Sequence, residues 1–169
     1  MHRATLIPMT MPLPELKQPA VLPEELRATT AFLLARVGYA IKLTAIEELE
    51  REGVSLYQYS VLAVLGEGVK ETQATIADTL KLDRGQLVGV LDGLEEAGLI
   101  ERRRDLSDRR RHAVSLTPAG KKQLVKIRRI VKRIEDTFLE PLDDKTRSAL
   151  HDALLRVAAS HDCRFEERQ

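Results

Sequence analysis

The apolar residues between positions 82 and 98, in the stretch LDRGQLVGVLDGLEEAG, recur at the spacing of an amphipathic helix. They fall on one face of that helix when successive residues are placed about 100° apart: Leu87, Val90, Leu91 and Leu94. Asp83 stands where its side chain can cap the first turn, and Gln86 follows three residues later as a capping-box partner. The pattern therefore predicts a helix that is capped by Asp83 and buries one face.

Three glycines mark the opposite face of this helix. Gly85, Gly89 and Gly93 lie at about 160°, 200° and 240° from Leu87, so we expect them to face away from the core. Inside a helix, each costs roughly 0.8–1 kcal/mol relative to alanine. Either this face lets another backbone approach closely, or its side chains matter little.

Two shorter helices are predicted before this one. Ser55 can cap the segment LYQYSVLAVLGEG, and Thr72 can cap the segment QATIADTLK. Lys81 and Leu82 then leave room for a tight turn before Asp83. Two short helices joined by such a turn are typical of a helix-turn-helix.

The periodicity changes after Gly98. Residues 99–102 and 111–116 are short and alternate between apolar and polar positions, which is typical of β-strands. They flank residues 103–110, RRDLSDRR, so we predict a two-stranded hairpin with a basic tip, a wing. Because a lone hairpin is marginally stable in water, this wing must pack against the helices.

Long helices are predicted on both sides of this region. The pattern between residues 23 and 52 predicts one helix of about 45 Å at ~1.5 Å per residue, long enough to pack on a second subunit. Thr117 and Pro118 predict the start of another helix, which runs to about Leu139. Asp143 can cap a last helix.

Composition supports a mostly α chain and locates its charge. Aromatic residues make up 4% of the 169 residues, with no tryptophan, which favours helices over a β-sandwich. The net charge of +1 hides a basic block, because residues 101–133 hold 13 lysines and arginines against three acidic residues. The rest of the chain holds 14 basic and 23 acidic residues. Such a block indicates a polyanion partner, and the alternative is a solvated helix face.

Several other classes of protein are not indicated. No apolar run reaches the roughly 18 residues of a membrane span, so we expect no membrane partner. The single cysteine, Cys163, is compatible with a reducing cytosol, and we expect a cytoplasmic protein. We find no catalytic constellation and no phosphate or dinucleotide loop, and expect neither an enzyme nor a cofactor. Because one helix cannot point His161, Asp162 and Cys163 at one ion, we also expect no metal site.

Several short motifs accompany this order of elements. They are LDR at residues 82–84, LEEAGLI at 94–100, and DRRR at 108–111 followed by LTPAG at 116–120. Over residues 26–159 the chain therefore resembles the MarR family of bacterial transcription regulators. The resemblance implies a mostly α fold, a winged helix-turn-helix with a small β-hairpin wing and long terminal dimerisation helices.

The resemblance also implies a division of the chain. Residues 53–116 would form the winged helix-turn-helix DNA-binding region, and residues 23–52 and 117–163 the helical dimerisation region. The segment 1–23 holds five of the seven prolines, so residues 1–22 are expected to be an extended or disordered arm.

The function that the resemblance implies is a homodimeric DNA-binding transcription regulator, which we expect to be a repressor. Each subunit would present one winged helix-turn-helix to half of a pseudo-palindromic operator in double-stranded DNA. Many members of the family bind a small anionic or phenolic effector between the dimerisation and DNA-binding regions and then release DNA.

On the recognition helix, the positions that match the family's groove-facing side are Gly85, Gln86, Val88 and Gly89, after Arg84. Gln86 can pair with adenine, Arg84 with guanine or phosphate, and Val88 with a thymine methyl. Relatives usually carry serine, threonine or arginine there, so direct base readout is sparse. We predict DNA contacts by Arg84, Gln86, Val88 and Gly89.

The wing supplies the second predicted contact. Arg109, Arg110 and Arg111 are predicted to reach the minor groove or the flanking phosphates, with His112 beside them, and the alternative is a solvated turn. Asp108 can hold one of these arginines by a charge-assisted hydrogen bond. Neighbouring side chains are either phosphate contacts or surface charges: Arg102, Arg103, Arg104 and His112. The basic residues of the next helix would add a general field: Lys121, Lys122, Lys126, Arg128 and Arg129.

Arg36, Tyr39, Tyr57 and Tyr59 are predicted to line an effector pocket, although a buried tyrosine is more often part of a core. Relatives that bind urate use a tryptophan in the first helix, and this chain has none, which argues against that ligand.

A second function stays open at this point. The glycine face of the recognition helix also fits a winged-helix protein-interaction module with little or no sequence-specific DNA binding. Selection of bound DNA fragments would separate the two hypotheses.

Overall fold

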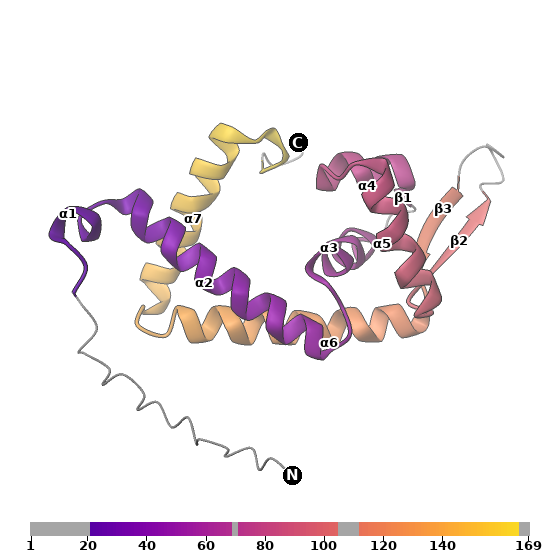
Figure 1. The fold of residues 1–169 in the computed structure, drawn as a ribbon, viewed down its shortest axis with the longest axis horizontal. Helices are drawn as coiled ribbons and strands as arrows, with labels where there is room; N and C mark the ends of the chain where they lie inside the picture. The colour runs from indigo at the N-terminus through magenta and orange to yellow at the C-terminus, as the bar shows by residue number, and fades with distance from the viewer. Residues whose placement is uncertain (1–20, 69–70, 105–111, 166–169) are drawn as a thin grey trace, which may run out of the picture. The chain divides into compact units, whose positions relative to one another are not determined.

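The computed structural model describes residues 21–68, 71–104 and 112–165. Within these ranges the chain forms seven α-helices, three β-strands and one 3-10 turn (Figure 1). The bounds are α1 Glu24–Arg27, α2 Thr30–Arg51, α3 Leu56–Leu65, β1 Glu71–Thr72, α4 Gln73–Leu80, α5 Arg84–Glu96, β2 Ile100–Arg104, β3 His112–Leu116, α6 Pro118–Phe138, α7 Asp144–His161 and η1 Cys163–Phe165. The described part of the chain divides after Val37 into two compact units.

The helix predicted over residues 23–52 is interrupted, because α1 ends and α2 begins only after a short turn. In this turn the Thr29 backbone N–H donates to the Leu26 carbonyl at 3.2 Å, and the Thr29 hydroxyl donates to the Glu25 carbonyl at 2.9 Å. Two successive β-branched residues, Thr29 and Thr30, also lower the local helix propensity. The prediction of one unbroken helix is therefore wrong here.

The predicted helix starts are confirmed by their caps. The Ser55 and Thr72 side chains each accept a hydrogen bond from the backbone N–H three residues later, and both form complete capping boxes. Thr117 accepts from Gly120 N at 3.0 Å at the start of α6, with Pro118 in the first position. Asp143 caps α7 in the same way.

The predicted hairpin is part of a larger sheet. β2 and β3 pair antiparallel from Ile100 opposite Leu116 to Arg104 opposite His112, as expected. The two-residue strand β1 adds a third strand on the other edge of β3, giving the order β1-β3-β2. Two residues are too few to show a periodicity, so the sequence pattern missed this strand.

The hydrophobic core lies where α3, α4, α5 and α6 meet this sheet. Its buried members are Leu49, Val54, Val61, Leu62, Leu65, Ile76, Ala77, Leu87, Leu91, Leu94, Ile100, Val114, Leu124 and Ile127. The start of α6 is pressed against the residue before β2, because a Cβ on Gly120 would lie 1.9 Å from the Leu99 carbonyl oxygen. The Thr117 hydroxyl also donates to the Gly98 carbonyl at 2.7 Å. The core therefore fixes α5, the sheet and α6 to one another.

Helix α7 differs from the helices of this core. Its 18 residues include none that is buried, although Leu154, Leu155 and Val157 are apolar. Val157 leaves 53% of its surface exposed. Among the described helices, we find none with both the length and the apolarity that a bilayer crossing requires.

Candidate nucleic-acid interface

Helix α5 is the second helix of the helix-turn-helix, and one of its faces is exposed to solvent. Its inner face is fixed by Leu87, Leu91 and Leu94, which are buried in the core. The four predicted contact residues are all exposed: Arg84, Gln86, Val88 and Gly89. The structure therefore brings these residues together on the first half of one helix, with their side chains accessible.

The turn before α5 is tight, as predicted. Lys81 ends α4 in the left-handed conformation with φ 50°, and the Leu82 N–H donates to the Ala77 carbonyl at 3.0 Å. Asp83 then accepts a hydrogen bond from Gln86 N at 2.8 Å and caps α5. The predicted return bond from the Gln86 side chain does not form, which leaves this side chain unconstrained by the cap.

The three glycines of α5 do not share one environment. Gly85 and Gly89 are exposed as predicted, and a Cβ on Gly89 would meet nothing within 4 Å. Gly93 is half-buried, and a Cβ there would lie 3.1 Å from the amide nitrogen of Gln58 on α3. The prediction that all three face away from the core is therefore wrong for Gly93, because α3 packs beside this part of α5.

Arg102 and Arg103 of β2 have different partners. The Arg102 side chain turns to α5, where its Nε donates to Glu95 Oε2 at 2.8 Å and its Nη2 donates to Asp92 Oδ1 at 2.5 Å. Arg103 pairs with Glu101 at 2.9 Å and keeps 76% of its side chain exposed. Arg103 is therefore accessible to a polyanion, whereas Arg102 is held by two carboxylates.

The ion pair shifts the titration of both groups. Hydrogen bonding from Arg102 holds the pKa of the Glu95 carboxyl below its usual range. The hydrogen bond that Arg102 donates to Glu95, and after it the one to Asp92, raises the pKa of the Arg102 guanidinium. Both groups therefore stay charged over a wide range around neutral pH.

The wing tip lies outside the described residues. This applies to Asp108, Arg109, Arg110 and Arg111, and the structure also leaves the side chain of His112 undescribed, although its backbone begins β3. Their predicted DNA contacts stay predictions.

The predicted basic surface of α6 is exposed: Lys121, Lys122, Lys126, Arg128 and Arg129. Lys126 forms an ion pair with Glu52, and Arg133, further along the same helix, pairs with Glu48 at 2.8 Å. Part of the basic block is thus balanced by carboxylates within the chain, and the same holds for Arg102 and Arg103 of the sheet.

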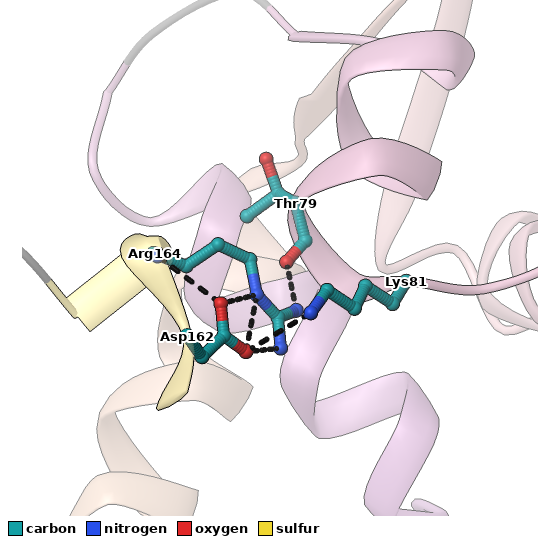
Figure 2. A network of polar contacts seen from close by, with 4 residues as sticks. All are labelled: Thr79, Lys81, Asp162 and Arg164. Carbon is teal, nitrogen blue, oxygen red and sulfur yellow. Dashed lines mark hydrogen bonds and ion pairs between the residues drawn. The ribbon is translucent and has the colours of Figure 1, made fainter. Parts of the chain in front are cut away.

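A polar network joins the end of α7 to the helix-turn-helix (Figure 2). The Arg164 Nη1 donates to the Thr79 carbonyl at 2.8 Å, and its Nε donates to Asp162 Oδ1 at 2.9 Å. Lys81 Nζ lies 3.2 Å from Asp162 Oδ2. Arg164, and to a lesser extent Lys81, hold the pKa of the Asp162 carboxyl far below its usual range. The sequence pattern did not indicate this network, because its partners lie far apart along the chain.

Comparisons with known proteins agree with this architecture. The profile described as "MarR family" matches residues 52–111. A transcriptional regulator (MarR family) from Rhodococcus sp. RHA1 is 31% identical, with a TM-score of 0.66 over 76% of this chain and 91% of that one. The chain belongs to the MarR family.

Two further relatives have named roles. The transcriptional repressor CouR, in a structure bound to a 23-mer DNA duplex, is 32% identical over 82% of this chain and 99% of that one, with a TM-score of 0.72. The putative transcriptional regulatory protein for the hcr operon of Thauera aromatica is 35% identical over 106 residues. That match covers 63% of this chain and 64% of the Thauera protein. The winged helix-turn-helix and mostly α fold of the MarR family is therefore also the fold of this chain.

The residues predicted to line an effector pocket have different environments in this MarR-family chain. Tyr39 on α2 and Tyr57 on α3 are exposed, by 59% and 50%, and Arg36 is exposed in the first unit. Tyr59 is half-buried and packs against the core. None of the four lines the cavity along residues 125–140 or the cavity between α2, α6 and α7.

One of these cavities lies between α2, α6 and α7 and has a volume of about 560 Å³. Its apolar lining consists of Ile41, Ala45, Val131, Ile134, Leu139, Leu150 and Leu154. Its polar lining consists of Lys132, Glu135, Asp136, Asp144, Arg147, Ser148 and His151. A cavity of this size that combines apolar side chains with polar and charged groups can hold a small organic molecule. The sequence did not indicate this cavity, because its residues come from three separate segments.

Proposed function

We propose that this chain is a dimeric DNA-binding transcription regulator, a repressor that binds a pseudo-palindromic operator and is released by a small effector. The observation that carries the proposal is the outer face of α5, on which Arg84, Gln86 and Val88 are exposed while the opposite face is buried. An exposed helix face at this place in a helix-turn-helix enters the major groove in DNA-binding proteins of this type. The relative CouR is a repressor that was solved with a DNA duplex.

The roles proposed for the side chains follow their chemistry. Arg84 and Gln86 supply hydrogen bonds to base edges, and Val88 supplies apolar contact. Gly89 lets the helix approach the bases closely. Asp108, Arg109, Arg110, Arg111 and His112 supply the contacts of the wing. Residues 53–116 thus form the DNA-binding region of the proposal, and the protein acts in the cytoplasm.

The proposed dimer is supported by apolar surface on the terminal helices. Leu154, Leu155 and Val157 of α7 remain exposed, although burying one such side chain is worth roughly 1.5–3 kcal/mol. Within the first unit, Leu33 and Leu34 are exposed as well. A second copy would cover these side chains through a two-fold interface, which also places two recognition helices on two half-sites. Residues 23–52 and 117–163 form this dimerisation region.

The proposed effector is a small anionic or phenolic molecule. CouR from Rhodococcus jostii RHA1 was solved with p-coumaroyl-CoA, which supports an aromatic, acidic class of ligand. The cavity between α2, α6 and α7 is a second candidate place for it besides the residues Arg36, Tyr39, Tyr57 and Tyr59.

Selection of bound fragments from the host genome tests the proposal. We expect an enriched inverted-repeat motif, and binding to it that weakens steeply as salt rises. Uniform weak binding, or none, would instead favour the protein-interaction module, for which the exposed Gly85 and Gly89 are the supporting observation.

Single substitutions then test the contacts. Arg84→Ala is expected to weaken binding by about tenfold or more if it contacts a base. Lys145→Ala, which removes an exposed charge from the first turn of α7, serves as the matched control and should change binding little. An unchanged affinity of Arg110→Ala would show that the wing assignment is wrong.

A further inference from the structure

Arg102 is tied to helix α5 by an unusually complete set of bonds. Its Nε and Nη2 both donate to Glu95 Oε2, at 2.8 and 2.5 Å, and Nη2 also donates to Asp92 Oδ1 at 2.5 Å. Its backbone N–H donates to Glu95 Oε1 at 3.3 Å. The Arg102 side chain is 20% exposed, against 76% for Arg103 next to it. Arg102 is therefore oriented by α5 through both its main chain and its side chain.

This set of bonds, which we call the Arg102 clamp, lies beyond the apolar contact between α5 and the sheet. Ile100 is buried, and Arg102 follows two residues later on the same face of β2, opposite the buried Val114. Asp92 and Glu95 are three residues apart on α5, so their side chains lie on one helix face. Along β2, the clamp is thus the contact with α5 that follows the buried contact of Ile100.

We propose that Arg102 is a positioning residue, which fixes the angle between the recognition helix and the β2–β3 wing and does not itself bind phosphate. The inference rests on the proposed function, because it concerns how two DNA-contacting elements are held at a fixed separation. A guanidinium that donates to two carboxylates suits this task, since its planar donors fix direction as well as distance.

Substitutions that neutralise the carboxylates of the clamp distinguish this proposal from a purely electrostatic effect on DNA binding. Asp92 and Glu95 are carboxylates on the recognition helix, and neutralising either one reduces repulsion from DNA. Simple electrostatics therefore predicts that Glu95→Gln raises the affinity for DNA. The clamp predicts the opposite, because the variant loses the charged acceptor that orients Arg102.

The experiment compares four variants on the selected DNA fragment at several salt concentrations. We expect Glu95→Gln and Asp92→Asn to weaken binding roughly two- to fivefold, the scale of a partly exposed ion pair. Glu96→Gln, which removes a neighbouring exposed carboxylate with no ion pair among the described residues, is the matched control and should hold or raise the affinity. Arg102→Ala should weaken binding without changing the slope of affinity against salt.

Either of two results would overturn the proposal. A decrease of the salt slope by about one in Arg102→Ala would mean that Arg102 neutralises a phosphate. A gain in affinity for both Glu95→Gln and Asp92→Asn, like that of the control, would mean that the clamp does not set the wing angle.

Amide hydrogen exchange tests the clamp without DNA, so its failure can be told from failure of the proposed function. In Glu95→Gln we expect faster exchange of the amides of β2 and β3, with unchanged exchange in α6 and an unchanged unfolding midpoint. Unchanged exchange in β2 and β3 would contradict the proposal even if the wild-type protein binds no DNA. Absence of DNA binding by the wild type, with faster exchange in the variant, would contradict the proposed function alone.

Discussion

The recognition helix α5 and the last long helix α7 follow similar apolar patterns but have different surroundings. Leu87, Leu91 and Leu94 of α5 are each at most 2% exposed, because neighbouring helices and the sheet pack against them. Leu154 and Leu155 of α7 carry the same side chain and stay 38% and 37% exposed. A single chain thus buries the apolar face of α5, but it leaves the apolar side chains of α7 partly exposed.

This difference separates two sources of stability. The core around α5 is made within one chain, so its contribution does not depend on protein concentration. Contacts of α7 that need a second copy contribute by mass action and weaken on dilution. Substitutions in the two helices test this contrast, beginning with the largest expected effect.

Leu91→Ala removes a fully buried side chain from α5 and leaves a cavity in the core. We expect the free energy of unfolding to fall by about 2–5 kcal/mol at every protein concentration, as measured by urea denaturation. Leu155→Ala is the matched change on α7, and its effect should shrink as the protein is diluted. Equal, concentration-independent losses in the two variants would contradict the contrast.

Val157→Glu places a charge on the exposed apolar surface of α7. We expect self-association to weaken at least about tenfold, because burying an unpaired carboxylate in an interface costs more than ~1.4 kcal/mol. Circular dichroism should show an unchanged helix content. Lys145→Glu, at an exposed position in the first turn of α7, is the control that should keep the wild-type mass. A Val157→Glu protein that associates like the wild type would place the interface elsewhere.

Gly89→Arg tests the outer face of α5, where a Cβ meets nothing within 4 Å. The fold should gain roughly 0.5–1 kcal/mol, since arginine favours a helix more than glycine does. Binding to the selected DNA should nevertheless be lost, because the side chain occupies the space in which the helix approaches the bases. Improved affinity would show instead that the groove has room for a longer side chain.

The smallest effect is expected from the network at the end of α7. The folded-state pKa of Asp162 lies below its ordinary value, so its contribution to stability is fully present above roughly pH 4 and is lost as the pH falls further. Arg164→Ala should therefore lower the unfolding midpoint slightly at pH 7, where the ion pair is charged, and the two midpoints should converge as the pH falls below about 4 and Asp162 becomes protonated. The same acid dependence in both proteins would show that the network does not persist in solution.

The features that were predicted correctly from the sequence depend on neighbouring residues. Ser55, Thr72, Thr117 and Asp143 each cap the helix that directly follows them, so spacing within four positions was sufficient. The buried face of α5 followed from the same short-range periodicity. The outline of the winged helix-turn-helix is therefore predictable from local sequence patterns.

The features that the sequence did not reveal depend on distant segments. β1 exists because Thr72 pairs with Ala113, and the half-burial of Gly93 results from the approach of Gln58 on α3. The basic block suggested that Arg102 contacts phosphate or solvent, whereas its side chain is engaged by α5. Charge along a sequence does not tell which cations are already paired within the fold.

The mass of the complex with the selected DNA duplex, measured by sedimentation equilibrium, shows directly whether two chains bind one operator. We expect two chains on each duplex that carries the inverted repeat, with the Val157→Glu variant failing to form this complex at the same concentration. A stable complex of one chain with the intact duplex would contradict a dimeric regulator, and so would a wild-type chain that remains monomeric and unbound at micromolar concentrations.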